Sequence, residues 1–155
     1  MRYWTRAAII SAVYVAVTAA FSPVSFGPVQ FRVAESLALL PFLWAEAIPG
    51  LFVGCLLANT FWGLGTVDIV LGSLATLLAA ALTRRMPNIW LAALPPVVVN
   101  ALIVGAYLTL WYPVPLGWSM VYVGLGQIAA CFALGIPLAT VLRRLERRLT
   151  GRQNL

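Results

Sequence analysis

Apolar segments long enough to cross a lipid bilayer follow one another along most of this 155-residue chain. The sequence is 63% hydrophobic and only 9% charged, which is more apolar side chain than a soluble domain of this length can bury. The membrane must therefore act as the solvent for most of these side chains. We expect an all-α integral membrane protein that forms a six-helix bundle.

The six helices are predicted to form a single membrane domain over residues 1–155. Proline and glycine in the connecting segments mark the breaks between the helices. We expect Pro95 and Pro96 to bend the fifth helix and Pro137 to interrupt the sixth. The predicted helices span about 5–21, 31–43, 47–61, 67–83, 89–111 and 118–148.

The second and third predicted helices are shorter than the roughly 20 residues of a full span, so a re-entrant hairpin is the rival interpretation. A hairpin of this kind returns to its starting side, so the parity of the crossings does not separate the two interpretations. The polar residues at 44–46 lie between two apolar runs and favour a turn at the inner face. We therefore predict six helices.

The distribution of arginine predicts the orientation of the bundle. Positive charge collects on the cytoplasmic side of membrane proteins, so both termini of this multi-pass protein are expected in the cytoplasm. The tenth basic residue, Arg32, lies on the opposite side beside Gln30 and Glu35. The nine that can share one side are Arg2, Arg6, Arg84, Arg85, Arg143, Arg144, Arg147, Arg148 and Arg152.

The formal net charge of +6 would suggest nucleic acid in a soluble protein. Here the basic residues flank apolar segments, so anionic lipid headgroups explain them better and no nucleic-acid partner is expected. The tryptophans support the same membrane arrangement because they fall at the ends of predicted helices, as an interfacial belt requires. They are Trp4, Trp44, Trp62, Trp90, Trp111 and Trp118.

Seven polar or ionisable residues interrupt the apolar sequence, and such groups inside a membrane usually have a partner or a task. Structural explanations exist: Arg32 and Glu35, three apart, can form an ion pair, and a helix dipole can stabilise Asp68. Amides can also hydrogen-bond between helices. Most of the set falls in the outer half, which predicts a small polar pocket opening outward beneath the loop at 22–30. The set is Gln30, Arg32, Glu35, Asn59, Asp68, Asn100 and Gln127, with Trp62 as a candidate for stacking on a ligand.

Two stripes of small residues recur at helical spacing, which lets a partner backbone approach closely. Each can pack the chain against itself or against another subunit. The first stripe is Ala8, Ala12 and Ala16, and the second is Gly50, Gly54 and Ala58. Cys55 and Cys131 lack metal-site spacing and are interpreted as small buried hydrophobes. Histidine is absent, so the commonest general base and metal ligand are missing, and neither cofactor nor catalysis is expected.

Three stretches resemble the QueT family of queuosine-precursor transporters. The most specific is residues 25–37, SFGPVQFRVAESL, which is similar to the family's first loop and second helix. Residues 54–59, GCLLAN, and 68–77, DIVLGSLATL, are similar to its third and fourth helices. The second half of the chain agrees in length and hydropathy but offers no sharp motif.

The resemblance implies the fold and role of a substrate-binding S component of an energy-coupling factor (ECF) transporter. Such a protein binds its solute from outside and delivers it inward by toppling in the membrane. A transmembrane coupling subunit and two ATPase subunits supply the energy, and the chain itself lacks a GxxxxGK[ST] phosphate loop. The implied solute is a 7-deazaguanine base: preQ0, preQ1 or queuine. Ala8, Ala12 and Ala16 would then contact the coupling subunit.

Other interpretations remain open at this stage. An S component for a different vitamin-like solute fits the same pattern, because pocket specificity is poorly readable from one sequence. An intramembrane enzyme would need a nucleophile with a base, or metal ligands, and the chain offers no such set. A passive channel would need a polar stripe through the whole membrane, whereas polarity here concentrates in the outer half. The sequence does not decide which base is bound, which polar residues touch it, or whether the ATPase module is shared.

Overall fold

The computed structural model describes residues 2–22, 31–63 and 65–149, which are helical with no strand among them. Some elements depart from α geometry: η1 and η3 are 3-10 helices, whereas η2 and η4 are π-helices. The elements in chain order are α1 (Arg2–Ala20), η1 (Val33–Leu39), α3 (Leu40–Leu43), α4 (Ala47–Trp62), η2 (Asp68–Gly72), α5 (Ser73–Arg84), α6 (Ile89–Ala92), α7 (Leu94–Tyr107), η3 (Leu108–Leu110), α8 (Leu116–Ile128), η4 (Ala129–Gly135) and α9 (Ile136–Leu149).

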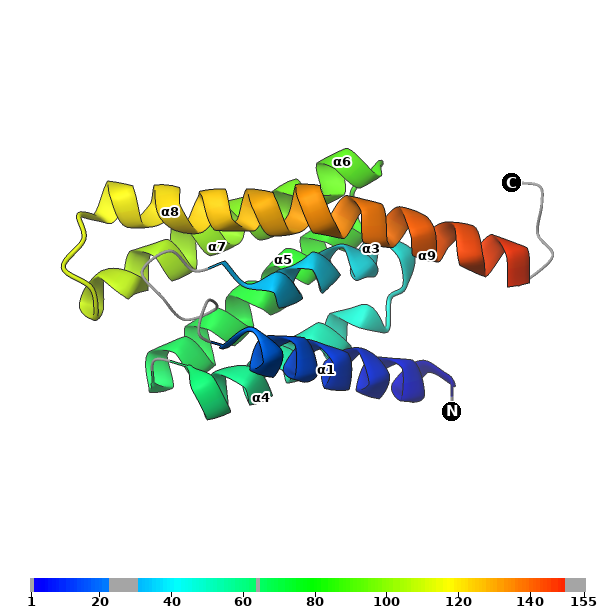
Figure 1. Cartoon of the computed structure of the whole chain (residues 1–155), viewed down its shortest axis with the longest axis horizontal. Coiled ribbons are helices and arrows are strands. Elements are labelled where there is room, and N and C mark those ends of the chain that lie inside the picture. The colour runs from blue at the N-terminus through cyan, green and yellow to red at the C-terminus, as the bar shows by residue number, and fades with distance from the viewer. Residues whose placement is uncertain (1, 23–30, 64, 150–155) are drawn as a thin grey trace.

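Within the described residues these elements form six helical segments, as the sequence predicts, and the segments pack into an elongated bundle (Figure 1). Three of the described segments are long and apolar enough to cross a membrane: Arg2–Ala20, Ile89–Leu110 and Leu116–Leu149. The segments Val33–Leu43 and Ala47–Trp62 are apolar but shorter. The turn between these two lies at the end of the bundle that carries the N and C labels, where Arg6 bonds to Glu46.

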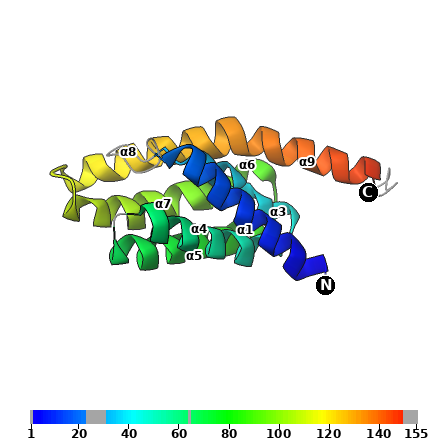
Figure 2. The same cartoon turned by 60° about the horizontal axis from the view of Figure 1, so that its bottom comes forward.

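Helix α1 packs against α4, the third helical segment, at residues with small side chains. A Cβ atom added to Gly50 would lie 2.7 Å from the carbonyl oxygen of Ala7, and one added to Gly54 would lie 2.9 Å from the Cβ of Tyr14. The backbones of α1 and α4 therefore approach closely because glycine stands at both positions. Figure 2 shows α1 crossing over α4. This confirms that the second small-residue stripe packs the chain against itself.

The first small-residue stripe lies on the outer face of α1. Helix α1 buries Ala7, Ser11 and Tyr14 against the bundle, whereas Ala8 and Ala12 are exposed. Ala16, one turn further on, is exposed as well. The described part of the chain therefore does not use the alanine stripe for its own packing.

Large apolar side chains are exposed on five of the six described segments, all except Val33–Leu43. Examples are Leu57, Leu74, Leu102 and Leu125, whose side chains are 41–56% exposed. A soluble protein rarely leaves so much contiguous apolar surface in water, whereas lipid is as apolar as leucine. The surface of the bundle is therefore matched to a hydrocarbon environment.

The two proline sites have different outcomes. Helix α6 ends at Ala92 and α7 begins at Leu94, so the α-helix is interrupted just before Pro95 and Pro96, inside the helical segment Ile89–Leu110. The bend expected there stays a prediction. The prediction that Pro137 interrupts the last helix is wrong, because the helix is continuous over Leu116–Leu149. The π-helix η4 ends at Gly135, two residues before Pro137, and widens the backbone where the proline ring would meet the carbonyl four residues earlier.

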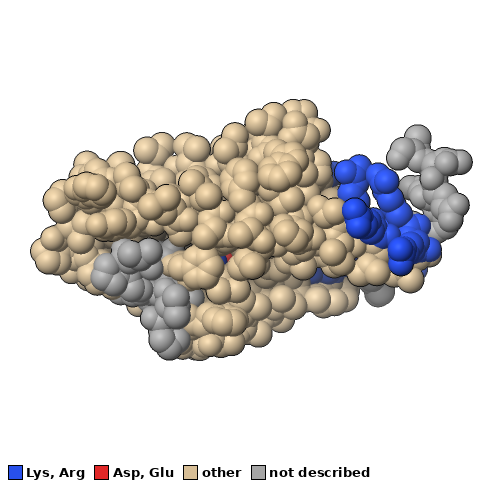
Figure 3. All heavy atoms as spheres, turned by 45° about the horizontal axis from the view of Figure 1, so that its top comes forward, with Lys and Arg blue, Asp and Glu red and all other residues tan. Residues whose placement is uncertain are grey.

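Arginine gathers at one end of the bundle. Helices α1 and α9 have their Arg-bearing ends there, and Arg84 donates to the carbonyl oxygens of Pro41, Phe42 and Leu43 at 3.2–3.4 Å. In Figure 3 basic side chains cover this end, while the rest of the visible surface is almost free of charge. The side of the membrane that this end faces stays a prediction, and Arg152 lies outside the described residues.

We expect Gly50→Ala to lower the stability of the protein in detergent. The new methyl group must push α1 away from α4, and such overpacking costs about 1–3 kcal/mol. The measurement is the thermal unfolding midpoint of the purified protein. Gly117→Ala is the matched control, because nothing lies within 4 Å of a Cβ atom added there. Equal midpoints in the two variants would contradict the close approach of the helices.

Candidate functional site

A cluster of buried ionisable side chains occupies the interior of the bundle. Arg32 is 5% exposed, Glu35 is 2% and Asp68 is fully buried. They come from segments distant in sequence, since Arg32 directly precedes η1, Glu35 lies on η1 and Asp68 begins η2. Ionised groups held away from water are stable only when they are paired and hydrogen-bonded. The partners of each group therefore define what the cluster can do.

Arg32 is bonded across the bundle rather than along its own helix. Its Nη1 donates to Oδ1 of Asn59 at 3.0 Å, and its Nη2 lies 3.3 Å and 3.4 Å from the two carboxylate oxygens of Asp68. Asn59 Nδ2 donates to the backbone oxygen of Asp68 at 2.9 Å. The hydroxyl of Tyr107 also donates to Oδ1 of Asp68. These four residues join η1, α4, η2 and α7.

The Arg32–Glu35 ion pair that sequence spacing allows is replaced by the Arg32–Asp68 pair. The reason lies in the backbone. The 3-10 helix begins at Val33, and Arg32 precedes it in an extended conformation with φ −90° and ψ 104°. Helical spacing therefore does not place the Arg32 side chain above Glu35.

Glu35 has a separate set of contacts. The hydroxyl of Tyr14 on α1 donates to its Oε1 at 2.6 Å. On the other side, Cys131 Sγ lies 3.7 Å from the backbone oxygen of Glu35 and 3.8 Å from Oε1 of Gln127. Cys131 therefore lies between the backbone of Glu35 on η1 and the side chain of Gln127 near the end of α8. Both cysteines are free and buried, as the sequence predicts.

Two glycines make room for the cluster. A Cβ atom added to Gly72 would lie 2.9 Å from both Asn59 Nδ2 and the Tyr107 hydroxyl, and 3.0 Å from Asp68 Oδ1. One added to Gly63 would lie 2.8 Å from Asp68 Oδ2. The polar groups therefore occupy the space that side chains would take at these positions.

Backbone that departs from α geometry surrounds the cluster. Glu35 stands on a 3-10 helix, Asp68 opens the π-helix η2, and Cys131 lies on the π-helix η4. Segments of π-helix inside α-helices are rare and occur frequently at functional sites. Their coincidence with the buried charges marks this part of the bundle as the candidate site.

The remaining predicted site residues have different positions. Asn100 on α7 is buried, and its Nδ2 has no hydrogen-bond partner among the described residues. Trp62 is 37% exposed at the end of α4 and packs against Phe61 with ring centroids 5.5 Å apart. Gln30 and the predicted roof of the pocket, residues 22–30, lie outside the described residues except for Ser22. The outward-opening pocket therefore stays a prediction.

Sequence reasoning missed Tyr14 and Tyr107, the two hydroxyl donors to the carboxylates. A tyrosine in an apolar segment needs a hydrogen-bond partner when buried, and Tyr14 stands in the middle of the first predicted helix. The position of Tyr14 within an apolar segment could therefore have identified it as a hydrogen-bonding residue. Tyr107 lies close to Trp111 near a predicted helix end, where an interfacial role explained it equally well.

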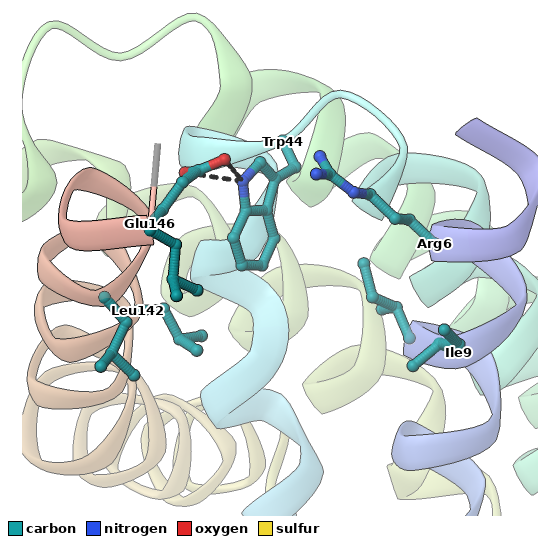
Figure 4. Close-up of a pocket in the computed structure, with 8 residues that line it drawn as sticks. Arg6, Ile9, Trp44, Leu142 and Glu146 are labelled. Carbon is teal, nitrogen blue, oxygen red and sulfur yellow. Dashed lines mark hydrogen bonds between the residues drawn. The ribbon is translucent and has the colours of Figure 1, made fainter. Parts of the chain in front are cut away.

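The arginine-rich end of the bundle holds a cavity of about 450 Å³ between α1 and α9. Trp44 Nε1 donates to both carboxylate oxygens of Glu146 at 3.0 Å and 3.1 Å across one wall (Figure 4). Arg6 on the opposite side pairs with Glu46 at 3.0 Å. The pKa of Glu46 is lowered, first by a hydrogen bond from its own backbone N–H and then by Arg6. These bonds tie the turn at 44–46 to both terminal helices.

A second surface groove, of about 400 Å³, runs along the outside of α1 and α4. Ala8 and Ala12 form one wall of this groove, and Pro49, Gly50 and Val53 belong to the other. Because its walls are small and apolar, the groove can accept a helix at close range.

The fold and the cluster together define a helical bundle with an apolar exterior that holds three ionisable groups in its interior. The chain belongs to the QueT family: the model described as "QueT transporter" matches residues 4–144.

A curated relative is the "Queuosine precursor transporter QueT" of Lactococcus lactis subsp. cremoris (strain MG1363). It is 38% identical over 77 residues, which are 48% of this chain and 45% of the relative. The similarity therefore spans less than half the length of that protein. No solved structure matches.

We expect Asp68→Asn to destabilise the protein strongly, because it leaves the buried Arg32 guanidinium without its carboxylate. Removing one partner of a buried ion pair costs about 3–5 kcal/mol. The thermal midpoint in detergent reports the change. Glu46→Gln is the matched control, since it breaks the Arg6–Glu46 pair, in which the Arg6 side chain is 51% exposed. A midpoint as high for Asp68→Asn as for Glu46→Gln would show that the buried pair is dispensable.

Proposed function

We propose that this protein is the substrate-binding S component of an ECF importer that takes up a queuosine precursor. The observation that carries the proposal is the cluster of Arg32, Glu35 and Asp68 buried inside a bundle with an apolar exterior. Charged groups in a membrane interior are costly and mark binding sites or transport pathways. Membership of the QueT family and the name of the curated relative support the choice of solute.

The chemistry of a 7-deazaguanine base suits the polar groups of the cluster. A carboxylate, Glu35 or Asp68, can accept hydrogen bonds from the ring N–H and the exocyclic amine, while the other can pair with an aminomethyl cation. An amide can donate to O6 of the base, and Asn100 supports this role because its Nδ2 is buried without a described partner. In an apolar site each unmade hydrogen bond costs about 1–3 kcal/mol, which supplies selectivity. Gln30, Asn59, Gln127 and Trp62 complete the proposed binding set with Arg32.

The protein acts without catalysis in this proposal, and separate ATPase subunits hydrolyse ATP. A transmembrane coupling subunit docks on the exposed alanine stripe of α1. The groove beside Ala8 and Ala12 supports this docking, because α1 leaves these small residues uncovered. The bundle lies in a prokaryotic cell membrane with both termini in the cytoplasm and delivers the bound base inward by toppling. The arginine-covered end shown in Figure 3 supports this orientation.

Equilibrium binding to the purified protein tests the choice of solute. We expect preQ0, preQ1 or queuine to bind more tightly than vitamins such as biotin or thiamine, and Glu35→Gln and Asp68→Asn to weaken that binding about tenfold or more. Unchanged affinity in both variants would show that neither carboxylate binds the base. Tight binding of a vitamin with no binding of any deazaguanine would reject the proposed solute.

Ala12→Leu tests the docking surface separately from the binding site. The larger side chain fills the groove, so we expect cellular uptake of the base to fall at least tenfold while the purified subunit keeps its affinity. Val13→Leu is the control, because Val13 is exposed on α1 but does not line the groove. Normal uptake by Ala12→Leu would show that the coupling subunit docks elsewhere.

A further inference from the structure

The buried cluster carries an unequal number of positive and negative groups. Among the described residues, the buried Arg, Asp and Glu side chains are Arg32, Glu35 and Asp68. One guanidinium therefore stands against two carboxylates. Because charge is expensive in an apolar interior, the pairing within this set decides which group still lacks a counter-ion.

Asp68 is in direct contact with the buried Arg32 guanidinium. It forms the buried ion pair with Arg32, and Asn59 holds the same guanidinium from the other side. The Tyr107 hydroxyl donates to Asp68 as well. Arg32 is therefore fixed at Asp68, and turning it toward Glu35 would break contacts with two residues.

Glu35 has a neutral partner instead. Its carboxylate accepts a hydrogen bond from the Tyr14 hydroxyl, and no cation lies within salt-bridge distance of it in the part of the chain that the structure describes. Among the described residues, the Glu35 side chain is therefore held by a phenol and has no cation in salt-bridge contact.

We propose that Glu35 is the specificity-determining residue for a ligand that carries a positive charge, and that Tyr14 positions its carboxylate. This inference rests on the proposed function and narrows its substrate class to 7-deazaguanine bases with a protonated amine on the 7-substituent. A primary amine has a pKa of about 10 and stays charged at neutral pH. Its ammonium group supplies the missing counter-ion, which a cyano group at the same position does not.

The test compares two bases that differ in charge and little in shape: 7-aminomethyl-7-deazaguanine and 7-hydroxymethyl-7-deazaguanine. Calorimetry on the purified full chain in detergent gives the dissociation constant of each. Hydrogen bonds to charged groups contribute enough for a preference of about 10- to 100-fold. We expect the wild-type protein to prefer the aminomethyl base by this factor and to bind the 7-cyano base as weakly as the hydroxymethyl base.

Variants assign that preference to a residue. Glu35→Gln keeps the shape of the side chain and removes its charge, so the ratio of the two dissociation constants should fall to about one. Tyr14→Phe keeps the carboxylate and should retain a preference for the cation while weakening both bases. Glu46→Gln removes a carboxylate outside the cluster and should leave the ratio unchanged.

Each result supports or overturns the inference. Equal affinity of the wild-type protein for the two bases overturns it without any variant and leaves the proposed function standing. Retention of the full preference by Glu35→Gln also overturns it, since the charge would then be recognised elsewhere. Failure of the wild-type protein to bind any of the three bases rejects the proposed function itself. If Glu35→Gln does not fold, the wild-type ratio and the Tyr14→Phe ratio still decide.

Discussion

The ion pair between Arg32 and Asp68 is the interaction on which the architecture of the site depends. It joins the start of the second helical segment to the start of the fourth, and Asn59 and Tyr107 extend it to two more helices. A guanidinium in an apolar interior is tolerable only with such a set of acceptors. The pair therefore constrains how these helices pack, and it holds the Arg32 guanidinium in contact with Asp68 rather than with Glu35.

The glycine positions explain how an apolar bundle accommodates this polar interior. Gly72 and Gly63 leave the space that the carboxylate of Asp68 and its partners fill, whereas Gly50 and Gly54 bring α4 against α1. The same residue type thus serves close helix packing at one end and polar packing at the other. Any side chain at Gly72 would compete directly with three atoms of the cluster.

Much of this organisation was predictable because the signals are local. The lengths of the apolar stretches and the Pro/Gly breaks between them predict six helical segments. The isolated polar residues of the sequence include Arg32, Glu35, Asn59 and Asp68, which meet in the buried cluster. The pairing among them was not predictable, because it depends on where a helix begins: Arg32 precedes η1, so its side chain does not follow helical spacing. The π-helices were equally hidden, since the hydrophobic pattern of a π turn hardly differs from that of an α turn.

Family membership indicates the class of protein, whereas the structure shows which side chains meet inside the bundle. Family membership rests on residues 4–144 and names a transporter family, but it does not say which groups meet a solute. The structure supplies the groups and their pairing. The structure adds two tyrosines to the residues predicted from the sequence. The Tyr14 hydroxyl donates to the Glu35 carboxylate, and the Tyr107 hydroxyl donates to the Asp68 carboxylate.

Helix α1 has one further consequence. Tyr14 reaches inward from it to Glu35, while Ala8 and Ala12, within two turns of Tyr14 on the same helix, form part of the outer groove. Glycine contacts leave no slack between the backbones of α1 and α4. The position of the inner hydroxyl and the contour of the outer groove are therefore set by the same helix.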